Sequence, residues 1–222
     1  YHIDRMTYRI PDDSIRSIVM ADSASSLIRP GKLFDRNVLE QERQRITDRL
    51  RNEGYFAFNK EYISYVADTT IGHKGVDLEL FLSDIPVADS SQTELVSFRK
   101  HNTYTVRNVY FITDYNPMGG TPEEKYAIKD TIFYKGYYIL YGEKEYLHPG
   151  TLVENCYILP GASYSTRMVD HTYSAFSRLE VLKYVNIQFT PVHGSETPQL
   201  DCHILLTEGK TQLVTTEVEG TN

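Results

Sequence analysis

The sequence predicts an α+β protein built from two successive copies of one small unit, each running strand, helix, helix, strand, strand. Three observations predict this class. Strand-like and helix-like hydrophobic patterns occur in that order over residues 1–86 and again over residues 98–210. A Pro-Gly pair precedes the longer helix in both halves. The last strand of each half shows the same alternation of apolar and polar residues. We therefore infer that the chain contains an internal repeat.

The first copy opens with a strand, because YHIDRMTYRI alternates apolar and polar residues. Asp12 then stands where an N-cap belongs, ahead of a first helix over DDSIRSIVM. The second helix lies within RPGKLFDRNVLEQERQRITDRLRNEG, where Asp35 and Asn37 are both candidate N-caps. One narrow apolar face of this helix contains Leu39, Ile46 and Leu50.

Gly54 is placed to end the second helix in the left-handed conformation. The aromatic stretch YFAFNKEYISYVAD is expected to begin a strand at once. After a turn at TTIGHKG, the third strand VDLELFL directs Val76, Leu78, Leu80 and Leu82 to one side. The polar stretch over residues 87–97 then predicts a linker to the second copy.

The second copy repeats this order. Its first strand is TYTVRNVYFIT, whose pattern does not decide which face is buried. Its first helix is PGTLVENCYI, and its third strand is LDCHILL. Lys183 replaces Gly54, so we expect a different turn between its second helix and second strand. The matched positions are Pro30-Gly31 with Pro160-Gly161, Phe34 with Tyr164, Asp35 with Ser165 and Ile46 with Phe176.

The second copy also contains an insertion over residues 114–148, between its first strand and its first helix. NPMGGTPEE is typical of a loop. TIFYKGYYILYG predicts an aromatic β-hairpin that turns at Lys135-Gly136.

Composition excludes several classes of function. A formal net charge of −7 argues against nucleic acid as a partner and against a polybasic membrane anchor. Two cysteines are too few for a disulfide scaffold, and no apolar run is long enough for a transmembrane helix. Because the chain begins with Tyr, we expect it to be a piece of a longer protein.

The Cys, His and acidic residues that could be catalytic or bind metal are better explained by structural roles. Cys156 and Cys202 fall on predicted core faces, so we expect buried thiols, although a disulfide stays open. His171 and His203 are predicted on solvated faces, and no metal-ligand spacing occurs. The longer first-copy helix interleaves arginines with carboxylates, including Glu40, Glu42, Asp48 and Glu53, as on an exposed charged face. We therefore predict no enzyme activity, no cofactor and no metal.

The repeated unit, with its Pro-Gly motif before the longer helix and LRNEGYF after it, resembles the polypeptide-transport-associated (POTRA) domain. POTRA domains lie on the periplasmic side of outer-membrane assembly proteins of the BamA/TamA family. The insertion and the Pro-Gly pattern look most similar to the TamA-like branch of Bacteroidetes. The resemblance implies a three-stranded mixed sheet in each copy, with two helices on one face and the strand order first, third, second. Residues 211–222 resemble the transition from the last such domain to a membrane barrel.

In that strand order the second strand is a free edge, to which an extended peptide can add as another strand. The edges are expected over Phe56–Val66 and Tyr184–Thr190. Aromatic side chains that cover the sheet or pack the two copies together are the structural alternative. The predicted peptide-binding residues are Phe56, Phe58, Tyr62, Ser64, Tyr65, Tyr184, Val185, Ile187 and Phe189. The hairpin could dock on the neighbouring domain, a partner protein or the barrel through Phe133, Tyr134, Tyr137, Tyr138 and Tyr141.

The resemblance implies a function at the periplasmic face of the outer membrane of a Gram-negative bacterium. There the chain would receive unfolded outer-membrane polypeptides or dock accessory assembly proteins, next to its own C-terminal membrane barrel. Two alternatives remain at this point. One is a secretion-pore transporter that recognises a single dedicated partner, and the other is a scaffold that binds no client.

Overall fold

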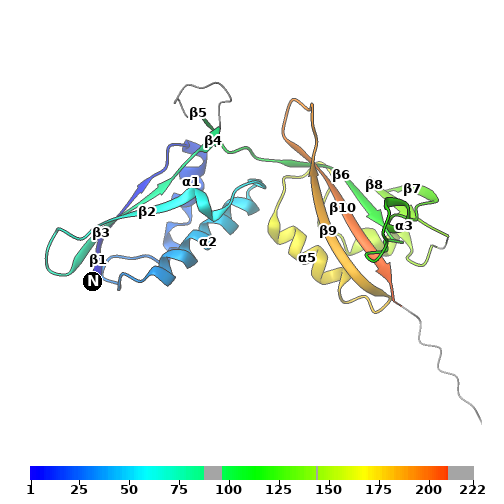
Figure 1. Ribbon diagram of the computed structural model, residues 1–222, viewed down its shortest axis with the longest axis horizontal. Coiled ribbons are helices and arrows are strands. Elements are labelled where there is room, and N and C mark those ends of the chain that lie inside the picture. The colour runs from blue at the N-terminus through cyan, green and yellow to red at the C-terminus, as the bar shows by residue number, and fades with distance from the viewer. Residues whose placement is uncertain (88–96, 144, 210–222) are drawn as a thin grey trace, which may run out of the picture. The chain divides into compact units, whose positions relative to one another are not determined.

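The computed structural model describes residues 1–87, 97–143 and 145–209, and these form two compact units (Figure 1). Unit 1 comprises residues 1–105 together with 163–166, and unit 2 comprises 106–162 and the described residues from 167 onward. Residues 88–96 of the predicted linker and the predicted transition at 211–222 lie outside the described residues.

Unit 1 has the predicted strand order. Its sheet runs β1-β3-β2, with β1 parallel to β3 and β2 antiparallel to β3. A separate two-stranded ribbon, β4 and β5, follows. The elements are β1 (His2–Arg9), α1 (Asp13–Ala21), α2 (Arg36–Asn52), β2 (Ile63–Asp68), β3 (Gly75–Leu82), β4 (Ile85–Val87) and β5 (Ser97–Arg99), with 3₁₀ turns η1 (Ser23–Ser25) and η2 (Lys60–Tyr62).

Local signals begin and end the helices of unit 1. The Asp12 carboxylate accepts hydrogen bonds from the backbone N–H groups of Ser14 and Ile15 at 2.8 and 3.1 Å, which caps α1. Asp35, rather than Asn37, caps α2. Gly54 has φ +98°, a conformation that favours glycine and turns the chain away after α2.

The second strand begins later than its sequence predicts. Instead of starting directly after Gly54, the chain makes tight turns up to Phe58 and then the 3₁₀ turn η2. The side chain of Asn59 accepts a hydrogen bond from the Glu61 N–H at 2.9 Å and caps that turn. β2 therefore starts only at Ile63.

Unit 2 has a five-stranded sheet in the order β7-β8-β6-β10-β9, so the predicted three-stranded sheet is wrong for this copy. The repeat order of first, third and second strand is present as β6-β10-β9, and the insertion adds β7 and β8 beside β6. The elements are β6 (Thr105–Ile112), α3 (Pro122–Lys125), β7 (Asp130–Tyr134), β8 (Tyr137–Tyr141), α4 (Pro149–Glu154), α5 (Thr166–Phe176), β9 (Leu182–Pro191) and β10 (Gln199–Glu208).

The insertion forms the predicted hairpin. β7 and β8 pair antiparallel around Lys135 and Gly136, whose φ angles are +49° and +89°. Positive φ at both central residues of a two-residue loop is the geometry of a type I′ turn, which matches the twist of the strands. The hairpin lies in the sheet of its own unit, because β8 pairs in parallel with β6.

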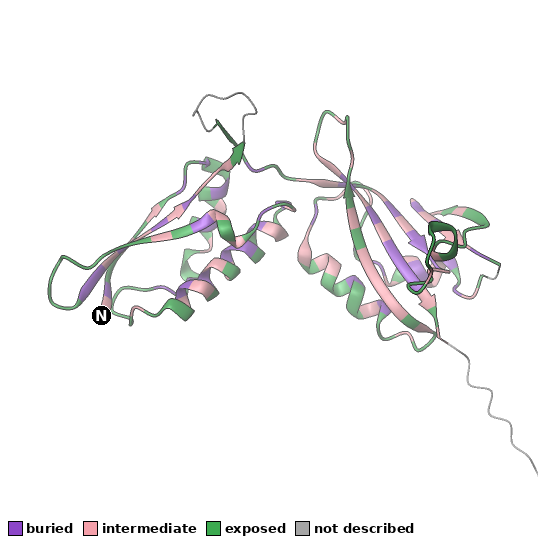
Figure 2. Ribbon diagram, viewed as in Figure 1, coloured by how far each residue is buried: buried purple, intermediate pink, exposed green. Residues whose placement is uncertain are grey.

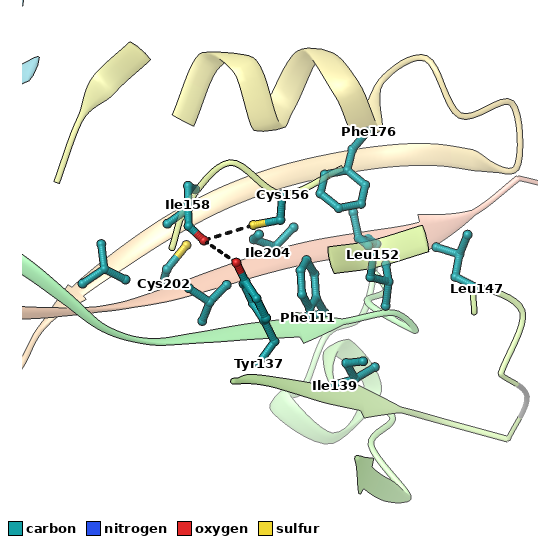
Figure 3. Packing of buried hydrophobic residues seen from close by; sticks show 13 residues of the cluster. Phe111, Tyr137, Ile139, Leu147, Leu152, Cys156, Ile158, Phe176, Cys202 and Ile204 are labelled. Atoms are coloured by element: carbon teal, nitrogen blue, oxygen red, sulfur yellow. Dashed lines mark hydrogen bonds between the residues drawn. The ribbon is translucent and has the colours of Figure 1, made fainter. Parts of the chain in front are cut away.

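The core of unit 2 fills the space between its sheet and helices α4 and α5 (Figure 3). Phe111, Phe176 and Ile204 are fully buried there. The carbonyl oxygen of Ile158 accepts hydrogen bonds from the Tyr137 hydroxyl at 3.2 Å and from the Cys156 thiol at 3.4 Å. The buried hydroxyl therefore has its partner.

Each third strand is buried as its sequence predicts (Figure 2). In β3 the four predicted inward residues are buried, and in β10 Leu200, Cys202, Ile204 and Leu206 are buried. Leu205 of β10 is also buried, although it faces the opposite side of the sheet. Among the described residues, no helix has the length and apolar character that a bilayer crossing requires.

The repeated Pro-Gly motif has the same structure in both units. Gly31 has φ +83° and donates its N–H to the carbonyl of Ile3 in β1 at 2.7 Å. Gly161 has φ +84° and donates to the carbonyl of Val106 in β6 at 2.6 Å. In each unit this loop therefore occupies part of the outer edge of the first strand.

Candidate functional site

The outer edge of β2 has no partner strand among the residues that the structure describes, because β2 is the last strand of its sheet. The carbonyl of Tyr62 accepts a hydrogen bond from the Ser83 N–H at 2.9 Å, which marks this pair as hydrogen-bonded. Hydrogen-bonding and non-hydrogen-bonding positions alternate along an antiparallel ladder, so the backbone groups of Ile63, Tyr65 and Ala67 face outward. The Ile63 N–H is already used by the carbonyl of Lys60.

A groove of about 580 Å³ runs beside this edge, between β2 and α2. Leu39 of α2 and Ile63 and Tyr65 of β2 supply its apolar surface. The Tyr65 hydroxyl donates to the carbonyl of Leu39 at 3.4 Å, which fixes the ring against the helix. A peptide paired with β2 would direct alternate side chains into this groove.

Charges of both signs rim the groove. The Arg43 guanidinium contacts Glu40 at 2.8 Å and Glu61 at 3.4 Å, and Lys60 contacts Glu40 as well. Arg43 also donates two hydrogen bonds to the carbonyl of Lys60 at 3.1 and 2.8 Å, which joins α2 to η2. Lys60 lowers the pKa of Glu40 by its hydrogen bond, against a smaller opposing effect of desolvation. The charged residues that line the groove itself are Arg36, Arg43, Glu40 and Glu61, two of each sign, so the groove favours no strongly charged peptide.

The structure separates the residues predicted for the first edge. Ser64 and Tyr65 lie in β2, but Phe56, Phe58 and Tyr62 precede it. Phe58 is 2% exposed and packs against the rings of Tyr62 and His101 at 4.9–5.6 Å, so it belongs to the core. The edge predicted over Phe56–Val66 is therefore corrected to Ile63–Asp68.

The second predicted edge is β9, which pairs with β10 on one side and has no described strand on the other. The Val192 N–H donates to the carbonyl of Gln199 at 2.9 Å, and alternation from this pair directs the backbone groups of Val185 and Ile187 outward. The side chains of Val185, Ile187 and Phe189 pack against the core of the unit. Tyr184 lies on the opposite face, stacked on Tyr115 at 5.8 Å.

The hairpin residues divide between the two faces of the sheet. Tyr137 is buried in the core, and Tyr134 packs against that core. Tyr138 and Phe133 lie together on the other face at 5.0 Å. The Tyr141 hydroxyl donates to the Asp130 carboxylate at 3.1 Å, across the hairpin.

Other predicted residues were assigned less accurately. Glu42 is 1% exposed rather than part of a solvated charged face, and it accepts a hydrogen bond from the Leu27 N–H and two from Arg45. His203 is half-buried rather than solvated, and its ring stacks on Tyr110. Sequence periodicity could not find the Leu27–Glu42 contact or the Tyr110–His203 contact, because each joins segments that are distant in the chain.

The two cysteines are free and buried, as predicted. Burial raises the pKa of the Cys156 thiol to about 12, and it raises the pKa of Cys202 well above its ordinary value. Both thiols are therefore protonated at neutral pH, which makes them poor nucleophiles and poor metal ligands. Within the described part of the chain, no cluster of three or more His, Cys, Asp or Glu residues could hold a metal ion.

Comparison with known proteins agrees with the fold described above. Residues 7–81 match the family model POTRA, described as "Surface antigen variable number repeat". The chain is similar to BamA from Haemophilus ducreyi lacking POTRA domains 1–3, with TM-score 0.57 and 15% identity over 94% of this chain and 30% of that one. It is also similar to POTRA domains 3–5 of Haemophilus influenzae BamA, with TM-score 0.50 and 14% identity over 94% of this chain and 61% of that one. No curated protein matches the chain.

Proposed function

Because residues 7–81 are a POTRA domain and the chain has the fold of the POTRA region of BamA, we propose that it holds extended client polypeptides by strand addition. The clients are unfolded outer-membrane proteins, and the chain acts as a non-enzymatic module at the periplasmic face of the outer membrane. Accessory assembly proteins and a membrane barrel of the same protein are its further proposed partners.

The observation that carries this proposal is the outer edge of β2 beside the groove of α2. Main-chain groups of Tyr65 and Ala67 point away from the sheet, and pairing with them requires no particular client sequence. Clients that share only the ability to form β-strands suit such a site. The outward groups of β9 offer a second edge of the same kind.

Simple magnitudes predict weak and reversible binding. Ordering five peptide residues costs roughly 5–10 kcal/mol of backbone entropy. Five new hydrogen bonds contribute about 2.5–7 kcal/mol net, so edge pairing alone does not hold a client. A side chain buried in the groove adds about 1.5–3 kcal/mol, which brings the middle of these ranges close to zero. Transfer of a client to a later site fits this balance better than storage does.

The substitution Ala67→Pro tests the edge. Proline removes the outward N–H of residue 67, but it leaves the inward ladder to β3 intact, and proline is tolerated at such edge positions. Loss of one hydrogen bond of about 0.5–1.5 kcal/mol predicts roughly 2- to 13-fold weaker binding at β2. Amide NMR titration of the chain with an unfolded outer-membrane strand peptide measures this change.

The matched control is Ala67→Ser, which keeps the N–H and should bind as the parent chain does. Shifts of the β9 amides serve as an internal reference, since they should not respond to the proline. Shifts confined to the helices, or unchanged affinity at β2 after Ala67→Pro, would contradict the proposed function.

A further inference from the structure

A separate pocket lies on the face of the unit 2 sheet opposite α4 and α5. Its volume is about 380 Å³. Ile112, Leu140 and Leu205 supply apolar side chains from three adjacent strands, and Ile112 and Leu205 are 5% and 1% exposed. Gln188 and Thr190 of β9 line it with exposed polar side chains. The pocket therefore combines an apolar base with an uncharged polar rim, a composition typical of ligand-binding sites.

The insertion builds part of this pocket. Leu140 lies in β8, and Tyr126 follows α3, which lies on the side of the sheet away from α5 (Figure 1). Tyr126 is held in place by a bridge to Tyr115 and by contact of the two rings at 5.4 Å. A capping box between Thr121 and Glu124 fixes the start of α3. The wall formed by Tyr126 is thus preorganised.

The opposite wall is the end of a row of aromatic rings that crosses four strands, three of them joined by stacked pairs. His203 of β10 stacks on Tyr110 of β6 at 5.1 Å, and Tyr110 stacks on Tyr138 of β8 at 5.0 Å. Phe133 of β7 continues the row at 5.0 Å from Tyr138. Asn108 donates a hydrogen bond to the Tyr110 hydroxyl at 3.1 Å. Tyr110 therefore has a stacked ring on each side, and it supports the ring of His203 from one side.

The pocket has no charge to offer a ligand. Its described lining contains no Asp, Glu, Lys or Arg, and burial lowers the pKa of His203 despite the opposing effect of Asp201, which favours the neutral imidazole. In the adjacent ion pair, Arg107 donates two hydrogen bonds to the Asp201 carboxylate, at 3.0 and 2.5 Å, so the two charges compensate each other. A charged ligand would lose its hydration here without gaining a partner.

We infer that this pocket binds one uncharged aromatic side chain, a Tyr or a Phe, of an extended polypeptide. Rings on two sides allow edge-to-face pairing, which an aliphatic side chain cannot make. Gln188 and Thr190 can exchange hydrogen bonds with a tyrosine hydroxyl at the rim. The inference stands apart from strand addition, because the pocket uses side chains on the sheet face and no outward backbone group of β9.

Blocked tripeptides test this pocket, because they are too short to add as a strand. The probes are acetylated and amidated Gly-Tyr-Gly, Gly-Phe-Gly, Gly-Leu-Gly and Gly-Glu-Gly, titrated into the 222-residue chain with labelled Ile and Leu methyl groups. The Tyr and Phe peptides should shift the methyl signals of Ile112, Leu140 and Leu205. The Leu peptide should bind several-fold more weakly, and the Glu peptide at least tenfold more weakly.

The substitution Tyr126→Ala removes one wall of the pocket and should weaken binding of the Tyr peptide at least fivefold. Tyr157→Ala is the matched control, since Tyr157 is 48% exposed against 38% for Tyr126 and contacts His171 of α5 instead. Unchanged methyl signals of Ile139 in the core verify that both variants are folded. Three results would each overturn the inference: no methyl shift with Tyr or Phe peptide, equal binding of the Glu peptide, or equal effects of the two substitutions.

Discussion

Replacement of Glu42 by glutamine should destabilise unit 1 more than its conservative chemistry suggests. The Glu42 side chain is 1% exposed and receives the Leu27 N–H at 2.9 Å and two N–H groups of Arg45 at 2.9 and 2.8 Å. It therefore joins α2 to the segment that follows η1. Burial alone would raise the pKa of this carboxyl, but hydrogen bonds from Arg45 and Leu27 outweigh it and hold the pKa below the ordinary value.

The size of the effect follows from these contacts. Glutamine keeps one accepting oxygen and loses the other, so one hydrogen bond to a charged group, worth about 1.5–3 kcal/mol, is removed. Arg45 keeps its ion pair with Asp22, so the loss stays below the roughly 3–5 kcal/mol that an abandoned buried charge costs. We expect the free energy of unfolding of unit 1 to fall by about 2–3 kcal/mol.

Urea unfolding followed by amide NMR measures this loss separately in each unit, through β3 for unit 1 and β10 for unit 2. The stabilisation by Glu42 requires the ionised carboxylate. Because its folded pKa is depressed, that stabilisation is present above the unfolded pKa, close to 4.5, and is lost as the pH falls through the lower folded pKa. The difference between Glu42→Gln and the parent chain should therefore shrink in acid.

Glu53→Gln is the matched control on the same stretch of chain. Its carboxylate contacts Arg49 at 2.9 Å but is 41% exposed, so its loss should change stability by less than about 0.5 kcal/mol. Equal stabilities of the two variants, or a Glu42→Gln effect that does not weaken in acid, would refute the assignment of Glu42 as a buried ionic link.

Two further predictions concern the turn after α2 and the core of unit 2. Gly54→Ala should destabilise unit 1 by about 1–2 kcal/mol, because φ +98° strains any residue with a Cβ, and Gly54→Asn should cost less in the same urea experiment. Cys156 should react with iodoacetamide roughly 1000-fold more slowly in the folded than in the unfolded chain, because burial raises its pKa from 9.0 to about 12. Mass spectrometry of the labelled chain measures this rate, and rapid labelling under native conditions would place the thiol outside the core.

Hydrophobic periodicity was sufficient to predict most of the fold. The alternation of VDLELFL identified β3, and Asp12 and Gly54 marked helix ends through local backbone chemistry that needs no tertiary contact. The start of β2 was not predictable in the same way. The aromatic stretch after Gly54 has strand propensity, but burial of Phe58 and the cap at Asn59 bend it into turns.

The candidate sites depend on contacts that no local pattern specifies. Tyr65 was predicted at the first edge, whereas Ala67 was missed because a small side chain carries no signal for an outward backbone group. The pocket of unit 2 was missed for another reason. Its walls come from Tyr126, Tyr110 and His203, which lie on three separate segments, and Tyr126 belongs to the insertion rather than to the repeated unit.

The two edges of each sheet differ in how far other segments cover them, and this difference limits where a strand can add. In unit 1 the segment after Pro30 bonds to β1, with the Ile3 N–H donating to the carbonyl of Lys32 at 2.8 Å. In unit 2 the Val106 N–H donates to the carbonyl of Ala162 at 2.8 Å, and β8 pairs with the far end of β6. The repeated Pro-Gly loop thus blocks part of the first strand in both units, whereas no such cover lies on the second strand within the described part of the chain. Since an exposed edge is a liability in a folded protein, its retention in both copies favours a role for it in binding.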